Sequence, residues 1–245
     1  MTNVLAGKTA IVTGASSGIG DATARLLARK GCNVVLAARR RDRLESLTSE
    51  LGEERTLAVP TNVTDPSACA ALIEQAVERF GSLDILVNNA GLGLYGPITE
   101  ADPEDWRRMF DVNVLAVLYT TQATARQILR QGSGHVVFIS SLAGRRVPRP
   151  DATVYAATKH AITAIAEGLK MELNEKGIRV TSVEPGLVRT EFPESSYPSA
   201  EEYYAEKGYA PLEAQDVASA VLYAIEQPSR VSVDEVLIRS SEQPK

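Results

Sequence analysis

The chain has 245 residues, of which 44% are hydrophobic, and its 26 Lys and Arg against 31 Asp and Glu give a net charge of −5. A chain of this length buries roughly 70% or more of its unfolded surface in a core. A mildly acidic chain has no overall field that attracts nucleic acid or anionic membranes. Its two cysteines, Cys32 and Cys69, are too few for a disulfide scaffold and lack the spacing of a metal site. We therefore expect neither nucleic acid nor metal as a partner.

The sequence also lacks membrane and export signals. No apolar run approaches the roughly 18 residues that a membrane span needs. Residues 1–8 lack the basic and apolar regions of a signal peptide. We therefore expect a cytoplasmic protein with no membrane partner.

Short runs rich in β-branched residues alternate with longer helical patterns along the whole chain. The predicted strands are Thr9–Thr13, Asn33–Ala38, Thr56–Val59, Leu83–Val87, His135–Ser140, Arg179–Glu184 and Glu235–Ile238. The predicted helices with readable ends are about Asp21–Lys30, Pro103–Arg130, Thr153–Lys176 and Glu213–Gln227. Alternating strands and helices form a parallel sheet covered on both faces. We expect a single α/β domain over residues 1–245, a Rossmann-like doubly wound sheet of about seven strands.

One segment interrupts this alternation. From about Gly186 to Pro211 the pattern predicts no strand, and four of the eight tyrosines lie there. Long irregular segments inside compact α/β domains are usually lids or binding loops. We interpret residues 186–211 as a substrate lid over the active face.

A glycine-rich turn follows the first predicted strand, with Gly14, Gly18 and Gly20 leading into a helix. Glycines permit a tight turn and a close approach of the backbone to a pyrophosphate, and the helix start offers N–H groups to the anion. The spacing G-x-x-x-G-x-G differs from the G-x-G-x-x-G of larger dinucleotide domains, and a structural turn is the alternative. We interpret it as a phosphate site.

The end of the second predicted strand indicates which dinucleotide binds. Ala38 stands where an NAD-binding fold carries an acid for the ribose hydroxyls, and Arg39 and Arg40 follow at once. Guanidinium groups match a ribose 2′-phosphate. The alternatives are a solvated basic helix start or a nucleic-acid patch. Because the sequence shows no second basic surface, the pattern favours NADP(H).

Tyr155 and Lys159 are four residues apart and so share one face of a predicted helix. A free phenol has a pKa near 10, and a neighbouring ammonium lowers it by favouring the phenolate. The phenol could then protonate a carbonyl oxygen or deprotonate an alcohol. A nearby hydroxyl could donate to the developing oxyanion. Without other motifs such a pair is usually two surface residues.

Further motifs make the pattern specific. Asn88-Asn89-Ala90-Gly91 ends the fourth predicted strand, Ser140-Ser141 ends the fifth and Pro185-Gly186 follows the sixth. In this order, over essentially the whole chain, the sequence resembles the short-chain dehydrogenase/reductase family. It most resembles the NADP-dependent branch with 3-hydroxy-acid (serine-type) and clavulanate-type dehydrogenases. The resemblance implies an NADP(H)-dependent oxidoreductase that transfers a hydride between nicotinamide and a small carbonyl or alcohol substrate.

The resemblance also implies residue roles. Tyr155 would be the acid/base, and Lys159 would hold the nicotinamide ribose and lower the tyrosine pKa. Ser141 would orient the substrate carbonyl, with Ser140 as the alternative, and Asn113 would anchor a water in the proton relay. The implied cofactor residues are Gly14, Ser16, Ser17, Gly18, Ile19, Gly20, Arg39, Arg40, Asn62, Val63, Asn89, Ala90, Gly91, Tyr155, Lys159, Pro185, Gly186, Val188 and Thr190.

The chain departs from the family's pattern at three places. Asn62-Val63 replaces an Asp-Val pair at the adenine edge, and the Asn62 oxygen is still expected to accept from the adenine amino group. Ser141 precedes Tyr155 by fourteen residues instead of about thirteen. Glu184 stands before Pro185 in place of a small polar residue, and the sequence offers no explanation for it.

Three loops would form the substrate pocket in this family. They contain the expected substrate residues Leu94, Tyr95, Arg145, Arg149 and Phe192, and beside them Leu92, Arg146, Tyr197, Tyr203 and Tyr204. The three arginines indicate a carboxylate-bearing substrate. Equally, they could face solvent or a partner subunit.

Two other functions are compatible with such a sequence. One is a non-catalytic NADP(H)-sensing protein, since a fold does not fix a function, although the intact catalytic set argues against it. The other is an epimerase or dehydratase, which would need more than the about 60 residues after Gly186. We also expect a homotetramer. Relatives pair the helices 103–130 and 153–176, whose apolar faces carry Val114, Val117, Leu118, Ile162, Ile165 and Leu169.

Overall fold

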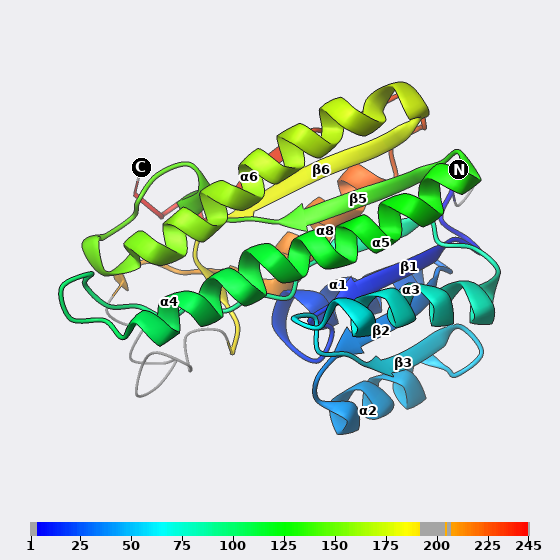
Figure 1. The fold of residues 1–245 in the computed structure, drawn as a ribbon, viewed down its shortest axis with the longest axis horizontal. Coiled ribbons are helices and arrows are strands. Elements are labelled where there is room, and N and C mark those ends of the chain that lie inside the picture. The colour runs from blue at the N-terminus through cyan, green and yellow to red at the C-terminus, as the bar shows by residue number, and fades with distance from the viewer. Residues whose placement is uncertain (1–3, 192–203, 205–206, 245) are drawn as a thin grey trace.

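The computed structural model describes residues 4–191, 204 and 207–244, and it contains one parallel seven-stranded sheet (Figure 1). The strand order is β3-β2-β1-β4-β5-β6-β9. The strands are β1 (Thr9–Thr13), β2 (Asn33–Ala38), β3 (Thr56–Pro60), β4 (Ile85–Asn88), β5 (Gly134–Ile139), β6 (Ile178–Pro185) and β9 (Glu235–Ile238). The strand order reverses between β1 and β4, and in such sheets ligands bind at the carboxyl ends beside this point. The predicted doubly wound α/β fold is confirmed.

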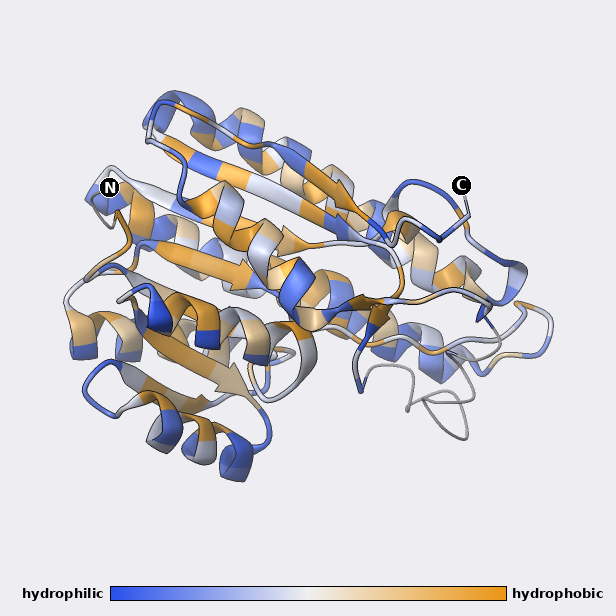
Figure 2. Ribbon diagram, turned by 180° about the vertical axis from the view of Figure 1, so that it is seen from behind, coloured by the Kyte–Doolittle hydropathy of each residue, from blue (hydrophilic) through white to orange (hydrophobic). Residues whose placement is uncertain are grey.

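Helices cover both faces of the sheet. The helices are α1 (Gly18–Arg29), α2 (Arg41–Leu51), α3 (Pro66–Phe80), α4 (Pro103–Phe110), α5 (Ala116–Gln131), α6 (Thr153–Leu173) and α8 (Ala214–Ile225). One hydrophobic core joins α1, α2 and α8 to the sheet, and a second joins α3, α5 and α6 to its other face. Figure 2 shows the apolar strands between these layers. Because both faces are covered, the central strands are apolar throughout instead of alternating.

The predicted helix 103–130 is interrupted. Asp102 caps α4 by accepting from Glu104 N at 2.9 Å, as its N-terminal pattern predicts. A π-helical turn, η1 (Asp111–Leu115), then separates α4 from α5. Such π turns are rare and often occur at functional sites. The apolar periodicity continues through the turn, so the sequence alone does not reveal it.

The prediction that residues 186–211 contain no strand is wrong. A two-residue strand β7 (Val188–Arg189) pairs in parallel with β8 (Leu212–Glu213). The buried Tyr204 reinforces this pairing, because its hydroxyl accepts from Thr190 N at 2.9 Å and donates to Val188 O at 2.8 Å. Two-residue strands leave no readable pattern. Residues 192–203 and 205–206, which include Phe192, Tyr197 and Tyr203, lie outside the described residues, so the lid stays a prediction.

Candidate active site

A cleft of about 1030 Å³ opens at the carboxyl ends of the strands, and it brings most of the predicted residues together. Of the predicted set, the cleft is lined by Gly14, Ser16, Ser17, Gly18, Ile19, Arg39, Arg40, Asn62, Val63, Asn89, Ala90, Gly91, Tyr95, Ser141, Arg149, Tyr155, Lys159, Pro185, Gly186, Val188 and Thr190. Among the described residues, six that the sequence predicted for the site do not line it: Gly20, Leu94, Asn113, Arg145, Arg146 and Tyr204.

The glycine-rich turn is packed against the end of β4. Gly14 has a φ of +68°, and a Cβ on it would lie 2.8 Å from Asn89 Nδ2. Asn89 Nδ2 donates to Thr13 O at 2.8 Å, which fixes the two strand ends together. Gly20 packs against Gly14 instead of facing the cleft. Within the described chain no side chain caps α1 at Ser17, so the first N–H groups of this helix are available to an anion.

Arginines gather at the end of β2. Arg40 Nη2 donates to Ser16 Oγ at 3.0 Å and to Ser17 Oγ at 2.8 Å, so its guanidinium lies against the glycine-rich turn. Its Nη1 forms an ion pair with Glu191 at 3.0 Å, and Arg43 reaches the same carboxylate at 2.6 Å. Burial acts to raise the pKa of Glu191, but the bonds from both arginines outweigh it and lower the pKa. Arg39 is exposed at the edge of the cleft.

The side chain of Asn62 is engaged within its own loop. Its Oδ1 accepts from Thr64 N at 3.3 Å and from Thr64 Oγ1 at 2.9 Å. Both lone pairs of the amide oxygen are therefore in use. The expected bond from an adenine amino group would have to displace one of these contacts.

Tyr155 and Lys159 lie on the first turns of α6 and face the cleft. The Lys159 Nζ donates to Ile139 O at 2.9 Å, and its distance from the centroid of the Tyr155 ring is 5.8 Å. Burial lowers the pKa of Lys159 to about 8, because the ammonium has lost its water. The Tyr95 ring meets the Tyr155 ring edge to face, with centroids 5.6 Å apart.

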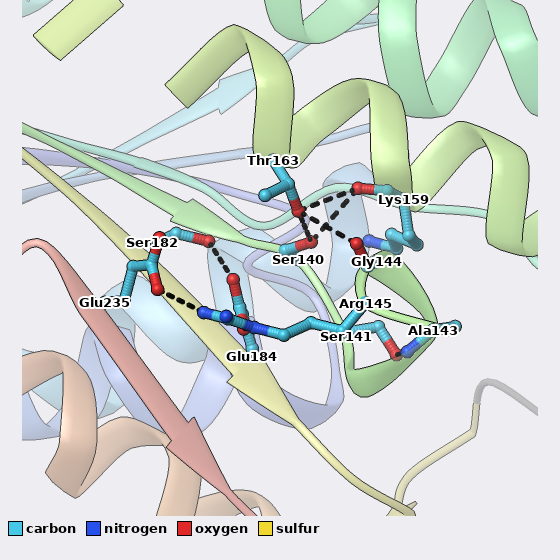
Figure 3. A network of polar contacts seen from close by, with 10 residues as sticks. All are labelled: Ser140, Ser141, Ala143, Gly144, Arg145, Lys159, Thr163, Ser182, Glu184 and Glu235. Carbon is cyan, nitrogen blue, oxygen red and sulfur yellow. Dashed lines mark hydrogen bonds and ion pairs between the residues drawn. The ribbon is translucent and has the colours of Figure 1, made fainter. Parts of the chain in front are cut away.

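The two serines after β5 differ in their surroundings (Figure 3). Ser140 is buried against α6, where its Oγ donates to Lys159 O at 3.3 Å and contacts Thr163 Oγ1 at 3.4 Å. Ser141 caps the short helix η2 (Leu142–Gly144) by accepting from Ala143 N at 3.1 Å. That bond uses one lone pair, and the Ser141 hydroxyl also carries a hydrogen to donate. The Ser140 hydroxyl thus donates within the protein, whereas the Ser141 hydroxyl, which also lines the cleft, accepts a hydrogen bond.

Asn113 lies in the π turn η1 and is buried. Its Oδ1 accepts from Leu92 N at 2.7 Å, and its Nδ2 donates to Leu92 O at 2.7 Å and to Thr158 Oγ1 at 3.0 Å. The amide thus ties the loop after β4 to α6. Its side chain holds the walls of the cleft without lining it.

The loop arginines separate into different environments. Arg149 lines the cleft with its guanidinium 4.5 Å from the centroid of the Tyr95 ring, and its Nε pairs with Asp151 at 2.7 Å. Arg145 instead binds Glu184 and Glu235, so the expectation that it faces substrate is wrong. Arg146 reaches Pro244 O at 3.5 Å. Leu94 lies next to the cleft, with its N–H 3.4 Å from Met109 Sδ.

Some residues that line the cleft were not predicted from the sequence. They are chiefly Arg108 on α4, Lys207, Tyr209 and Gln243 near the end of the chain. The side chain of Gln243 accepts from Leu187 N at 3.1 Å, so the last residues fold back beside Gly186. No local pattern marks such a return of the chain, because it depends on tertiary contacts alone.

Two further features are absent from the part of the chain that the structure describes. No group there of three or more His, Cys, Asp and Glu side chains could hold a metal ion. None of the helices found there is long and apolar enough to cross a membrane.

Comparison with known proteins identifies the class to which this fold and site belong. The family model for short chain dehydrogenases matches residues 8–200. The chain therefore belongs to the short-chain dehydrogenase family, a family of oxidoreductases, and the resemblance seen in the sequence is confirmed. An uncharacterized oxidoreductase of Staphylococcus aureus strain MW2 is 42% identical over 236 residues, which are 96% of this chain and 98% of the relative.

Solved structures agree over the same extent. The closed form of a serine dehydrogenase complexed with NADP+ is 31% identical, with a TM-score of 0.91 over 97% of this chain and 96% of that chain. An alcohol dehydrogenase from the archaeon Thermococcus sibiricus, complexed with 5-hydroxy-NADP, is 32% identical. Its TM-score is 0.86 over 97% of this chain and 98% of that chain.

Proposed function

We propose that the protein is an NADP(H)-dependent oxidoreductase that transfers a hydride between nicotinamide and a carbonyl or alcohol carbon of a small molecule. Tyr155 is the acid/base. The observation that carries this proposal is a single cleft lined both by the glycine-rich turn with its arginines and by Ser141, Tyr155 and Lys159. The NADP+ of the serine dehydrogenase and the 5-hydroxy-NADP of the archaeal enzyme support the same cofactor here.

The residues of the cleft fit this cofactor. The start of α1, which no described side chain caps, would hold the pyrophosphate. Arg39 and Arg40 would hold the 2′-phosphate, and Lys159 the ribose next to nicotinamide. When bound, the cofactor supplies or takes up the hydride. The adenosine would meet Asn62, Val63, Asn89, Ala90 and Gly91, and the carboxamide would meet Pro185, Gly186, Val188 and Thr190.

The proton moves at the hydroxyl of Tyr155. The buried ammonium of Lys159, 5.8 Å from the centroid of the Tyr155 ring, favours the phenolate form of this side chain. In reduction the hydroxyl gives its proton to the carbonyl oxygen, and in oxidation it takes one from the alcohol. The Ser141 hydroxyl donates a hydrogen bond to the same oxygen. Asn113 would anchor a relay water, and Leu92 and Thr158 hold its side chain in place.

The substrate carries a carboxylate in this proposal. Arg149 supports it, because it lies over Tyr95, the ring that contacts Tyr155. Arg108 adds a second guanidinium to the wall of the cleft. The alternative, that these arginines face a partner subunit, predicts no preference for acids over neutral carbonyls.

We also propose that the enzyme is a cytoplasmic homotetramer. Phe110, Leu115 and Leu118 support assembly through α4, η1 and α5, because each of these apolar residues is at least 40% exposed. Two of the residues expected at this interface, Val117 and Ile162, are instead buried in the core of the subunit.

The proposed function is tested by following NADPH and NADH oxidation with aldehydes, ketones and keto acids, and reduction of NADP+ and NAD+ with hydroxy acids. We expect turnover with NADPH and preference for substrates that carry a carboxylate. Tight binding of NADPH without turnover of any carbonyl would instead support the non-catalytic, NADP(H)-sensing alternative.

A further inference from the structure

Arg145 is the centre of an ion cluster with Glu184, Glu235 and Ser182 (Figure 3). Its Nε donates to Glu184 Oε2 and its Nη2 to Glu235 Oε2. Ser182 Oγ donates to the other Glu184 oxygen, Oε1, at 3.2 Å. The Glu184 side chain is 0% exposed, whereas that of Arg145 is 40% exposed. A guanidinium at the surface therefore neutralises a carboxylate in the core.

The cluster joins two loops that follow the neighbouring strands β5 and β6, and both loops line the cleft. Arg145 ends the turn that begins at Ser141, and Glu184 directly precedes Pro185 and Gly186 at the end of β6. Glu235 begins β9, and at the other end of this strand Ile238 O accepts from Gly186 N at 2.7 Å. Arg145 thus connects the Ser141 turn to the strand pair that carries the Pro185–Gly186 loop.

The other side of the Ser141 turn has little freedom. A Cβ on Gly144 would lie 2.8 Å from both Ser140 Oγ and Thr163 Oγ1, so the turn is in close contact with α6. A buried carboxylate without a partner is strongly unfavourable, which favours a fixed position for the guanidinium beside Glu184. The turn is therefore held between α6 on one side and the ion cluster on the other.

We propose that Arg145 is a positioning residue that sets Ser141 relative to the Pro185–Gly186 loop. This inference rests on the proposed function, in which Ser141 binds the substrate oxygen and the loop binds the nicotinamide carboxamide. The cluster then fixes the distance between the substrate carbonyl at Ser141 and the nicotinamide at the Pro185–Gly186 loop, without contacting either group. It also gives a reason for the acid at position 184, which the sequence left unexplained.

The test compares R145M/E184Q, R145K, E235Q and the matched control R29M, at an exposed arginine that ends α1 outside the cleft, with the wild type. R145M/E184Q removes both charges together, so that no carboxylate is left buried and unpaired. For each variant we would measure kcat, KM, the NADPH Kd and the melting temperature. Because misplacement by about 1 Å can cost of the order of a hundredfold in rate, we expect kcat of R145M/E184Q to fall at least about tenfold, with the NADPH Kd within about twofold. R145K should recover part of kcat, and R29M should match the wild type.

A purely structural role would lower the melting temperature and leave kcat of the folded enzyme unchanged, and this result would overturn the inference. Parallel losses of kcat and NADPH affinity would also overturn it, because they would indicate a damaged cofactor site. If R145M/E184Q does not fold, the same criteria are applied to the kcat, the NADPH Kd and the melting temperature of R145K and E235Q. The turnover of the wild type and of the Tyr155→Phe variant is measured in the same assays. An inactive wild type, or a fully active Tyr155→Phe variant, would reject the proposed function itself.

Discussion

At the residue scale, Lys159 shows how the fold sets the chemistry of one side chain. The residue is 7% exposed, and among the described residues its Nζ bonds to the main-chain Ile139 O and not to a carboxylate. A carboxylate partner would neutralise the charge and weaken its effect on the Tyr155 phenol. Burial of the charged Lys159 side chain therefore lowers the stability of the folded protein, while in the proposed function it favours catalysis. Such a trade-off is common at active sites.

This cost predicts a pH-dependent stability. The Lys159 pKa is lowered from 10.5 to about 8, so below pH 8 both folded and unfolded chains carry the proton and the folded state bears the whole cost. Between about pH 8 and 10.5 the unfolded chain binds the proton and the folded chain does not, so stability rises with pH. Relative to Lys159→Met, the wild type should gain about 3 kcal/mol across this window.

The measurement is urea unfolding of both proteins at pH 7 and pH 10 without cofactor. The difference between the wild type and Lys159→Met isolates the contribution of Lys159, because the two proteins share every other titrating group. A constant difference in free energy of unfolding between the two pH values would contradict the burial of a charged Lys159.

A second prediction at this scale concerns the choice of cofactor. We expect the wild type to prefer NADPH, by about ten- to hundredfold per charged contact to the 2′-phosphate. The exposure of Arg39 places the effect at the lower end. Ala38→Asp combined with Arg39→Ala should invert the preference, because the new carboxylate repels the phosphate and accepts from a ribose hydroxyl.

The measurement is kcat/KM with NADPH and with NADH, for the wild type and for the double variant, at one ionic strength. Arg41→Ala is the matched control, since Arg41 is exposed and pairs with Glu45 on its own helix. Equal use of NADH and NADPH by the wild type would show that the arginines do not select the cofactor.

At the scale of elements, the π turn η1 connects local structure to the site. It brings Asn113 to the loop after β4 and to α6, so one buried amide joins three segments around the cleft. A regular helix from 103 to 130 would have one residue fewer in this turn and would point position 113 elsewhere.

Asn113→Ala should therefore lower the free energy of unfolding by about 2–4 kcal/mol, because the partly buried N–H and C=O of Leu92 lose their partner. Activity should fall as the loop loosens. Asn33→Ala is the control, since the Asn33 amide makes an exposed bond of 3.5 Å to Gly7 O. Denaturant unfolding that shows equal effects for both variants would contradict the role of Asn113.

Much of this arrangement was predictable from the sequence, because strand and helix periods are local. The seven predicted strands begin and end within two residues of those in the structure, and the glycine-rich turn and α6 lie where their motifs indicate. The break at η1 was not predictable, since the apolar pattern continues through it. Arg145 and Arg149 are four residues apart in one loop, and only tertiary packing directs one to Glu184 and the other to the cleft.

At the scale of the whole molecule, the sheet brings the cofactor residues and the reacting groups to one edge. The order reversal between β1 and β4 opens the cleft, and both cores lie behind it. The apolar side chains left exposed on α4 and α5 are consistent with a symmetric assembly that buries them.

We expect light scattering to give a tetramer at micromolar concentration. Leu118→Glu should yield smaller species, because Leu118 is 41% exposed on α5 and a charge there opposes burial. Gln75→Lys, on the exposed face of α3, should leave the tetramer intact. A monomeric wild type would contradict the assembly.

The most direct test of the account is the turnover of Tyr155→Phe, measured with its NADPH affinity. In the proposed function the phenolic oxygen acts on the substrate oxygen, whereas the glycine-rich turn and the arginines are the main groups that hold the dinucleotide. The account predicts a loss in kcat of about a hundredfold or more, with the NADPH Kd nearly unchanged. A Tyr155→Phe variant with the kcat of the wild type would contradict the account.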